Sequence, residues 1–377
     1  MDTSKRLAKL REYMEENRIS LSIIMNPENQ YYVSGFKAII YSRPIALLVE
    51  PAATGLIIPG LEEKHAEAEA AVDRLYIYYE HPEKTEDPKS YMEHLDKIIS
   101  AFPHGTRLGV EANAMSTGLA VYLKNKGYEL FDIGRKIAEM RFIKDEQEIE
   151  LLIEAGKLVS LALSESLKKA MAGISEIELD QYGNKALFEE TAQKYPNASL
   201  DYFVMSPSGL IRSVMPHVFS NTRKLTENDI VIHSRQVGLN GYRAECERTF
   251  FIGEPTAKQK EVFNVAFEAQ KAAMEMIKPG IMAKEVDMAA RQIIQKAGYG
   301  EYAIHRTGHG IGLGVHEEPS LRFDSDLILQ EGMAFSIEPG IYIPGVGGFR
   351  HSDTVIITKE GARVITDYPR ELEHLIF

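Results

Sequence analysis

The chain has 377 residues, of which 44% are apolar and 26% charged, and its formal net charge is −12 at pH 7. These values are ordinary for a globular protein and argue against disorder, collagen and coiled coils. The length suggests two domains or one large one. The acidic balance argues against a nucleic-acid binder, which needs a basic face to neutralise phosphates.

Cysteine usage and the apolar runs bear on location. Cys246 is the only cysteine, so an intrachain disulfide and a zinc site built from thiolates are both excluded. A chain without disulfides fits a reducing compartment, and we expect a cytoplasmic protein. The first 20 residues are charged throughout, unlike a signal peptide. The longest apolar stretches are interrupted by proline and glycine and fall short of the roughly 20 residues that span a membrane, so we expect a soluble protein with no membrane partner.

The first part of the chain alternates helical and strand-like patterns. Leu7, Leu10 and Met14 follow helical spacing with charged residues between them, which predicts an N-terminal helix. A second helix is expected near 87–101. Strand-like runs lie at 21–25, 45–50, 55–59, 74–79 and 107–111. This alternation predicts a small α/β domain with a mixed sheet over residues 1–136.

The second part begins with a long helical pattern from about Lys144 to Met171. The sequence around the junction has no Gly/Ser-rich or Pro-rich linker, so we expect two packed domains, with the second at 137–377. Further helices are expected at 174–193, 257–277 and 283–297. Strands are expected at 229–234, 241–252, 333–343 and 353–358.

Histidines, glycines and carboxylates gather in four short runs of this second domain, at 215–217, 244–251, 305–319 and 338–353. Glu245 and Glu247 lie two apart, so in a strand both project from one face. Two such carboxylates repel each other unless a metal ion, a cationic substrate or an arginine lies between them. The alternative is that both glutamates lie on an exposed strand face, which is the usual case for such a pair. The apolar run 249–251 suggests a buried strand instead, so the two interpretations are about even.

Three histidines, His305, His309 and His316, fall within twelve residues among glycines. The spacing of the first two resembles a helical zinc motif, but the flanking glycines disfavour a helix. A single histidine is usually a hydrogen-bonded core residue, whereas three together favour a functional site. Glu338 precedes Pro339-Gly340 in an apolar run, which predicts a turn and a buried carboxylate that needs a partner.

Three runs carry a family resemblance: GYRAECERTF at 241–250, HRTGHGIGLGVHEEP at 305–319 and EPGIYIPG at 338–345. With them, the chain resembles the aminopeptidase P / prolidase / creatinase superfamily over nearly its whole length. The resemblance implies a small N-terminal mixed-sheet α/β domain, a C-terminal catalytic domain with the pita-bread α+β fold, and a homodimer.

Most members of that superfamily are peptidases with two metal ions, bound by two Asp, one His and two Glu. The matching positions of this chain hold Ser234, Glu245, His309, Glu338 and Ser352. Three of the five are changed, and two have become neutral hydroxyls, which bind hard divalent ions weakly. We therefore expect no two-metal site.

At the site, the chain resembles the metal-free creatinase-like branch more closely. The matching residues are Met205-Ser206, His217, Thr222-Arg223-Lys224, and Glu247 directly before Arg248-Thr249. This resemblance implies hydrolysis, without a cofactor, of a C–N bond in a small zwitterionic amidine or guanidino compound like creatine or ectoine. It implies His217 as general base and Glu247 and Glu338, helped by Glu245, as the residues that bind the cation.

The same resemblance assigns the remaining candidates. His309 and His316 would orient the substrate or stabilise the tetrahedral intermediate, and Arg43 from the partner subunit would bind the substrate carboxylate. A solvated loop charge is the alternative for Arg43. Ser234 would lie at the substrate, as would Ser352, which has His351 beside it.

Two other functions stay open. One is a diverged Xaa-Pro dipeptidase or aminopeptidase with a single weak divalent metal site at Glu245, His309 and Glu338. The other is a non-catalytic peptide-binding module, which the intact GHGIG run and His217 disfavour, since a binder needs no proton shuttle.

Overall fold

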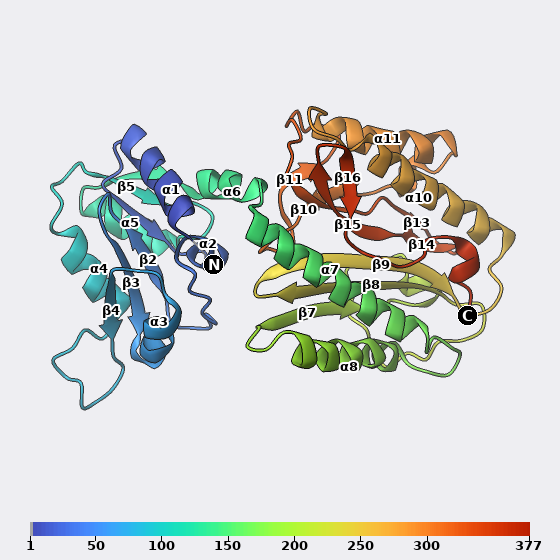
Figure 1. The fold of residues 1–377 in the computed structure, drawn as a ribbon, viewed down its shortest axis with the longest axis horizontal. Helices are drawn as coiled ribbons and strands as arrows, with labels where there is room; N and C mark the ends of the chain where they lie inside the picture. Colours follow the sequence, from blue (N-terminus) through green and yellow to red (C-terminus); the bar gives the residue numbers. More distant parts are fainter. Residues whose placement is uncertain (1–2) are drawn as a thin grey trace. The chain divides into compact units, whose positions relative to one another are not determined.

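The computed structural model describes residues 3–377 and divides into two compact units, one that ends at Arg141 and one that spans Phe142–Phe377 (Figure 1). The boundary expected between residues 136 and 137 lies within α6 (Gly134–Phe142) and stays a prediction. Among the described residues, none of the helices is both long and apolar enough to cross a membrane.

The N-terminal unit is built on a six-stranded mixed sheet with the order β4-β3-β2-β1-β5-β6. β1 pairs antiparallel with β2 and parallel with β5, which confirms the mixed sheet that the sequence predicts. The strands are β1 (Leu21–Ile24), β2 (Ala46–Val49), β3 (Thr54–Pro59), β4 (Arg74–Tyr78), β5 (Arg107–Val110) and β6 (Glu129–Asp132).

Short helices complete this unit: α1 (Ser4–Glu16), α2 (Pro27–Ser34), α3 (Glu63–Glu69), α4 (Tyr91–Ile99), α5 (Thr117–Asn125) and α6. α2 was not predicted from the sequence, because its eight residues carry no amphipathic period. Asn26 caps its start, and the buried Glu111 accepts hydrogen bonds there from the backbone N–H of Met25 at 2.6 Å and of Asn26 at 2.7 Å. Tertiary contacts thus help to hold a helix too short to be stable alone.

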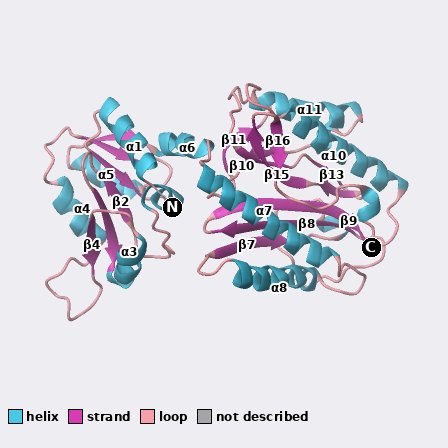
Figure 2. Ribbon diagram, in the orientation of Figure 1, coloured by secondary structure: helices cyan, strands magenta, loops and turns pink. Residues whose placement is uncertain are grey.

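The C-terminal unit contains an eight-stranded sheet with the order β11-β10-β12-β15-β9-β8-β7, in which β16 also pairs with β15. Two pairs of long helices, α7 with α8 and α10 with α11, lie over it, as Figure 2 shows in cyan against the magenta strands. The strands are β7 (Leu200–Met205), β8 (Ile230–Leu239), β9 (Tyr242–Phe251), β10 (Gly308–Gly310), β11 (Glu317–Leu321), β12 (Ala334–Ile337), β15 (Ser352–Thr358) and β16 (Gly361–Val364). This is the pita-bread architecture expected from the resemblance.

The long helices begin at strong local signals. Capping boxes open α7 (Glu146–Leu167), α8 (Glu176–Lys194) and α10 (Ala257–Met276), each with an Asp, Ser or Thr whose side chain bonds the backbone three residues on. α11 (Ala283–Lys296) and the four-residue α9 (Gly209–Arg212) complete the set. Their apolar faces join the inner faces of the strands in one core.

The strand expected over 333–343 is two strands, β12 and β13 (Gly340–Ile343). Pro339 cannot donate a ladder hydrogen bond, so the chain leaves the large sheet there. β13 then pairs with β14 (Gly347–Arg350) in a separate two-stranded ribbon. The change of sheet places Glu338 and Arg350 beside the functional site.

Candidate active site

Adjacent strands of the large sheet bring the site residues together. In the sheet register, Ser234 on β8 and Ser352 on β15 both lie opposite Glu247 on β9, and His309 on β10 lies opposite Ser336 on β12. Because side chains alternate along a strand, Glu245 shares the face of Glu247. Both glutamates are buried, so of the two interpretations left open by the sequence the buried face is correct and the exposed face is wrong.

Three of these side chains converge. Glu245, His309 and Glu338 each offer one ligand atom, and these atoms all lie within 4.8 Å of one another. His309 Nδ1 contacts the Gly310 carbonyl oxygen at 2.9 Å. Its Nε2 is buried 3.3 Å from Glu338 Oε1, but it makes no hydrogen bond to any residue of 3–377. An imidazole nitrogen without a hydrogen bond beside two carboxylates is a donor set that fits a divalent metal ion.

Electrostatics also favour a cation here. Burial alone would raise the pKa of Glu338, but the neighbouring His309 and the charge of Arg350 lower it well below its ordinary value. Burial alone would lower the pKa of His309, and Glu338 raises it instead. Glu338 is therefore an anion, and the position beside His309 attracts positive charge.

Hydroxyl and amide groups orient the Glu245 carboxylate. Ser336 Oγ at 2.9 Å and Ser352 Oγ at 2.7 Å donate to Oε1, and Gln236 Nε2 donates to Oε2. Each carboxylate oxygen has two lone pairs, so Oε2, which accepts one bond, still has a lone pair that can bind a metal ion.

Glu247 has a different partner. The buried Arg350 binds its carboxylate in a bidentate pair, with Nε 2.5 Å from Oε1 and Nη2 2.7 Å from Oε2. Burial opposes the charge of Arg350, yet Glu247 raises the pKa of this guanidinium well above its ordinary value. The cation that the two glutamates were expected to need is thus supplied in part by the protein itself.

A cavity of about 450 Å³ opens beside these residues, a size that suits a small-molecule substrate. Its polar lining residues are Ser234, Gln236, Glu245, Glu338 and Arg350, together with His217 and His316. Its apolar lining residues are Phe203, Met205, Val218, Phe219 and Val315. The ring of His316 lies 4.1 Å from that of His309 and 6.4 Å from that of His217.

Most of the predicted site residues therefore meet at one place, but two do not. His351 is fully buried against the ring of Phe263, 4.7 Å away, and is absent from the cavity lining. Arg43 belongs to the N-terminal unit, where it forms a half-exposed ion pair of 2.7 Å with Glu80. Its role in a partner's site stays a prediction.

Several residues of the site were not predicted from the sequence. Gln236 follows the candidate Ser234 at the two-residue strand interval, which could have identified it. Arg350 opens the RHSD run that was used only to align Ser352. No local pattern pointed to Ser336 or to the aromatic side chains of Phe203 and Phe219.

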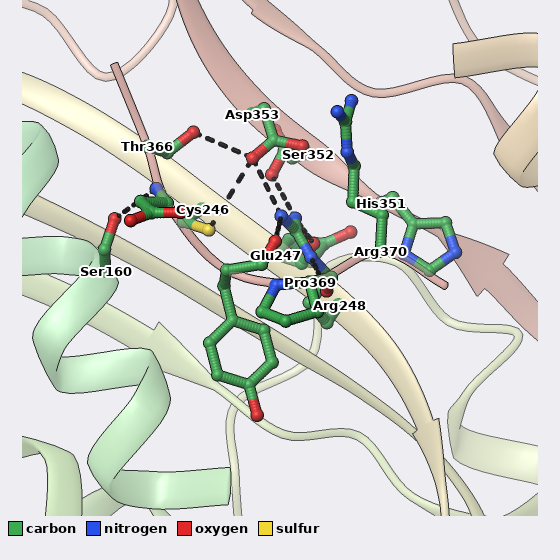
Figure 3. Close-up of polar contacts among 12 residues, drawn as sticks. Ser160, Cys246, Glu247, Arg248, His351, Ser352, Asp353, Thr366, Pro369 and Arg370 are labelled. Atoms are coloured by element: carbon green, nitrogen blue, oxygen red, sulfur yellow. Dashed lines mark hydrogen bonds and ion pairs between the residues drawn. The ribbon is translucent and has the colours of Figure 1, made fainter. Parts of the chain in front are cut away.

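The reverse face of the same strands is fixed by a buried ion pair (Figure 3). Arg248 Nη2 lies 2.9 Å from Asp353 Oδ1, and its Nη1 donates to the carbonyl oxygens of Glu247 and Ser352. Cys246 is buried on this face, with Sγ 3.9 Å from the same aspartate oxygen. Cys246 therefore points away from the two glutamates, and the backbone that carries Glu247 and Ser352 is held by these contacts.

Comparison with known proteins gives two matching family models. Residues 6–143 match the Creatinase/Prolidase N-terminal domain, and residues 150–359 match Metallopeptidase family M24. The chain belongs to family M24.

Individual proteins resemble it along their whole length. A Xaa-Pro dipeptidase of Pyrococcus horikoshii is 33% identical over 374 residues, which cover 98% of this chain and 99% of that protein. The crystal structure of the prolidase from P. horikoshii matches with a TM-score of 0.85 at 32% identity, over 98% of this chain and 100% of the other. The Xaa-Pro dipeptidase from Bacillus anthracis matches with a TM-score of 0.84 at 30% identity, over 100% of both chains.

These findings confirm the superfamily and the fold, but they overturn the expected function. The relatives are Xaa-Pro dipeptidases of a metallopeptidase family, so the prediction of a metal-independent, creatinase-like hydrolase of amidines is wrong. The prediction of no cofactor is wrong with it. The physical reason is that the loss of two ligands at Ser234 and Ser352 leaves three donors in place, and these still converge on one point.

Proposed function

We propose that this M24 hydrolase cleaves Xaa-Pro dipeptides with one divalent metal ion held by Glu245, His309 and Glu338. The observation that carries the proposal is the convergence of these three donors within 4.8 Å beside a substrate-sized cavity. The dipeptidase relatives support the choice of substrate.

The proposal of a single ion rests on the residues around it. Ser234 and Ser352 present hydroxyls where further carboxylates would be needed, and Glu247 is already neutralised by Arg350. Three protein ligands with open positions are typical of catalytic zinc sites. When bound, a divalent ion polarises the substrate carbonyl and lowers the pKa of bound water.

The chain's own residues would bind and orient the dipeptide. The aromatic and aliphatic wall of Phe203, Phe219 and Val315 would pack against the proline ring and exclude water. His217 and His316 would hydrogen-bond the peptide carbonyl, and imidazole can pass a proton to the leaving proline nitrogen near neutral pH.

The finer expectations on assembly and location remain proposals. We propose that the protein acts on a small molecule as a homodimer in the cytoplasm, with no nucleic-acid or membrane partner. Light scattering in solution tests the homodimer, and cell fractionation tests the cytoplasmic location.

The decisive experiment measures metal content and activity together. Purified protein is dialysed against chelator, then titrated with Mn²⁺, Co²⁺ or Zn²⁺ while hydrolysis of Ala-Pro is followed. We expect activity to vanish with chelator and to return as about one ion binds per chain. Glu245→Gln should prevent both, whereas the exposed Glu189→Gln should change neither. Chelator-resistant cleavage, or no cleavage by the protein with its ion bound, would contradict the proposal.

A further inference from the structure

One side of the cavity is formed by residues 213–221, which we call the wall segment. It consists of turns and irregular loop between α9 and the start of β8, and it contributes His217, Val218 and Phe219 to the cavity lining. Ser213 at its start is buried, but several of the side chains that follow are poorly covered by the rest of the protein, since Phe219 is 77% exposed and Met215 42% exposed. Packing alone therefore does little to fix its position.

A single buried carboxylate binds both ends of the wall segment. Glu176, on the first turn of α8, is fully buried. Before the segment, Arg212 donates to it from Nε at 3.1 Å and from Nη2 at 2.9 Å. After the most exposed part of the segment, the backbone N–H of Asn221 donates at 2.9 Å. The N–H and hydroxyl of Ser208 add bonds of 2.9 and 2.6 Å.

Arg212 passes this restraint to the cavity wall itself. Its Nη2 also donates to the carbonyl oxygen of Phe219 at 2.7 Å. The backbone N–H groups of Glu176 and Ile177 in turn donate to the carbonyl oxygens of Arg223 and Asn221, at 3.0 and 3.3 Å. The first turn of α8 therefore holds residues 221–223, at the end of the wall segment, through both backbone and side-chain hydrogen bonds.

A second carboxylate, one helical turn further along α8, repeats the arrangement. Asp180 accepts from Ser206 Oγ at 2.6 Å and is also hydrogen-bonded by Ser220. The backbone N–H of Ser206 donates to Ser220 Oγ at 2.8 Å. Ser206 follows Met205 and Ser220 follows Phe219, so Asp180 connects two stretches that line the cavity.

We propose that Glu176 is a positioning residue that holds the wall segment and thereby sets the places of His217 and Phe219 at the substrate. The inference rests on the proposed function for its effect on catalysis, but not for its effect on the segment. Hydrogen bonds to a buried charge are among the stronger ones, and this carboxylate accepts five of them.

The test compares Glu176→Gln with Glu189→Gln, a change at an exposed glutamate of the same helix. Hydrogen exchange, metal content, kcat and KM for Ala-Pro are measured on both. In Glu176→Gln we expect exchange in residues 213–221 to rise by roughly tenfold or more. Because the three metal donors lie on other elements, metal content should stay the same. KM should rise about tenfold, and kcat should fall as well, because the segment also carries His217. Glu189→Gln should match the parent protein.

A second variant guards against misfolding. Arg212→Gln breaks the same bridge from the partly exposed side and should give the same exchange and KM pattern. Unchanged exchange in 213–221, or faster exchange with an unchanged KM, would overturn the proposal. If the parent protein cleaves no dipeptide, the proposed function fails, yet exchange in the wall segment still decides whether Glu176 holds it.

Discussion

At the scale of single residues, the site differs from a two-metal peptidase site in how charge is distributed. Glu247 faces Ser234 and Ser352 across the sheet, so one carboxylate stands among hydroxyls. Arg350 neutralises it from the neighbouring ribbon, because an unpaired carboxylate in a fully buried position would cost several kcal/mol. The anionic charge left for a metal ion is that of Glu245 and Glu338.

This distribution predicts that a second metal site can be restored. In the double variant Ser234→Asp/Ser352→Glu, we expect metal content to rise from about one to about two ions per chain, because carboxylates bind hard divalent ions far better than hydroxyls. Metal analysis after equilibrium dialysis measures this directly. Without metal, the variant should be less stable to urea than the parent, since the added charges then lie unpaired beside Glu245 and Glu247. A variant that still binds one ion would refute the proposed cause of the single site.

At the scale of elements, β8 is joined to α8 by a buried polar network on the face opposite the site. His233 Nε2 accepts from Arg235 Nε at 2.9 Å, and its Nδ1 contacts Ser206 Oγ at 2.7 Å. Asp180 Oδ1 lies 3.8 Å from Nδ1. Burial, with a further contribution from Arg235, lowers the pKa of His233 well below its ordinary value, so this histidine is neutral in the folded protein.

The buried, neutral His233 predicts that the free energy of unfolding depends on pH. The unfolded chain binds a proton at His233 below about pH 6.5, whereas the folded protein does not, so stability is present above that pH and is lost as pH falls. The expected loss from this residue is about 1.4 kcal/mol per pH unit between roughly pH 6 and pH 5. Urea unfolding of the parent and of His233→Gln over this range measures it. Equal slopes for the two proteins would show that His233 does not contribute.

At the scale of the whole molecule, the metal donors come from distant parts of the chain. Glu245, His309 and Glu338 lie on β9, β10 and the turn after β12, and among residues 3–377 they are the one group of three such donors found close together. A bound ion therefore connects elements that the unfolded chain would separate. Ligands that bind the folded state alone stabilise it by mass action.

We accordingly expect divalent metal to raise the melting temperature of the protein. At a free metal concentration of about 100 times Kd, the stabilisation should be about 2.7 kcal/mol, or several degrees for a unit of this size. Calorimetry over a series of metal concentrations tests this. His309→Gln, which removes the central donor, should melt at a temperature that metal does not change. A parent protein that is equally insensitive would contradict the proposed site.

Local sequence determined much of the architecture. Helical patterns in the sequence predicted α7, α8, α10 and α11, the strand alternation set Glu245 and Glu247 on one face and Cys246 on the other, and the glycine-rich runs identified the superfamily. These signals act over a few residues, so they can be read without knowledge of the fold.

Only the tertiary structure decided which side chains meet. Arg350 reaches Glu247 because Pro339 turns the chain into a separate ribbon, and three metal donors converge because β10, β12, β15 and β9 lie side by side in that order. The serines at 234 and 352, where most superfamily members have carboxylates, suggested that metal binding was lost. The sequence shows which donors are absent, but it does not show the distances among the donors that remain. Distances between residues far apart in the chain are set by strand order and register, which no local pattern encodes.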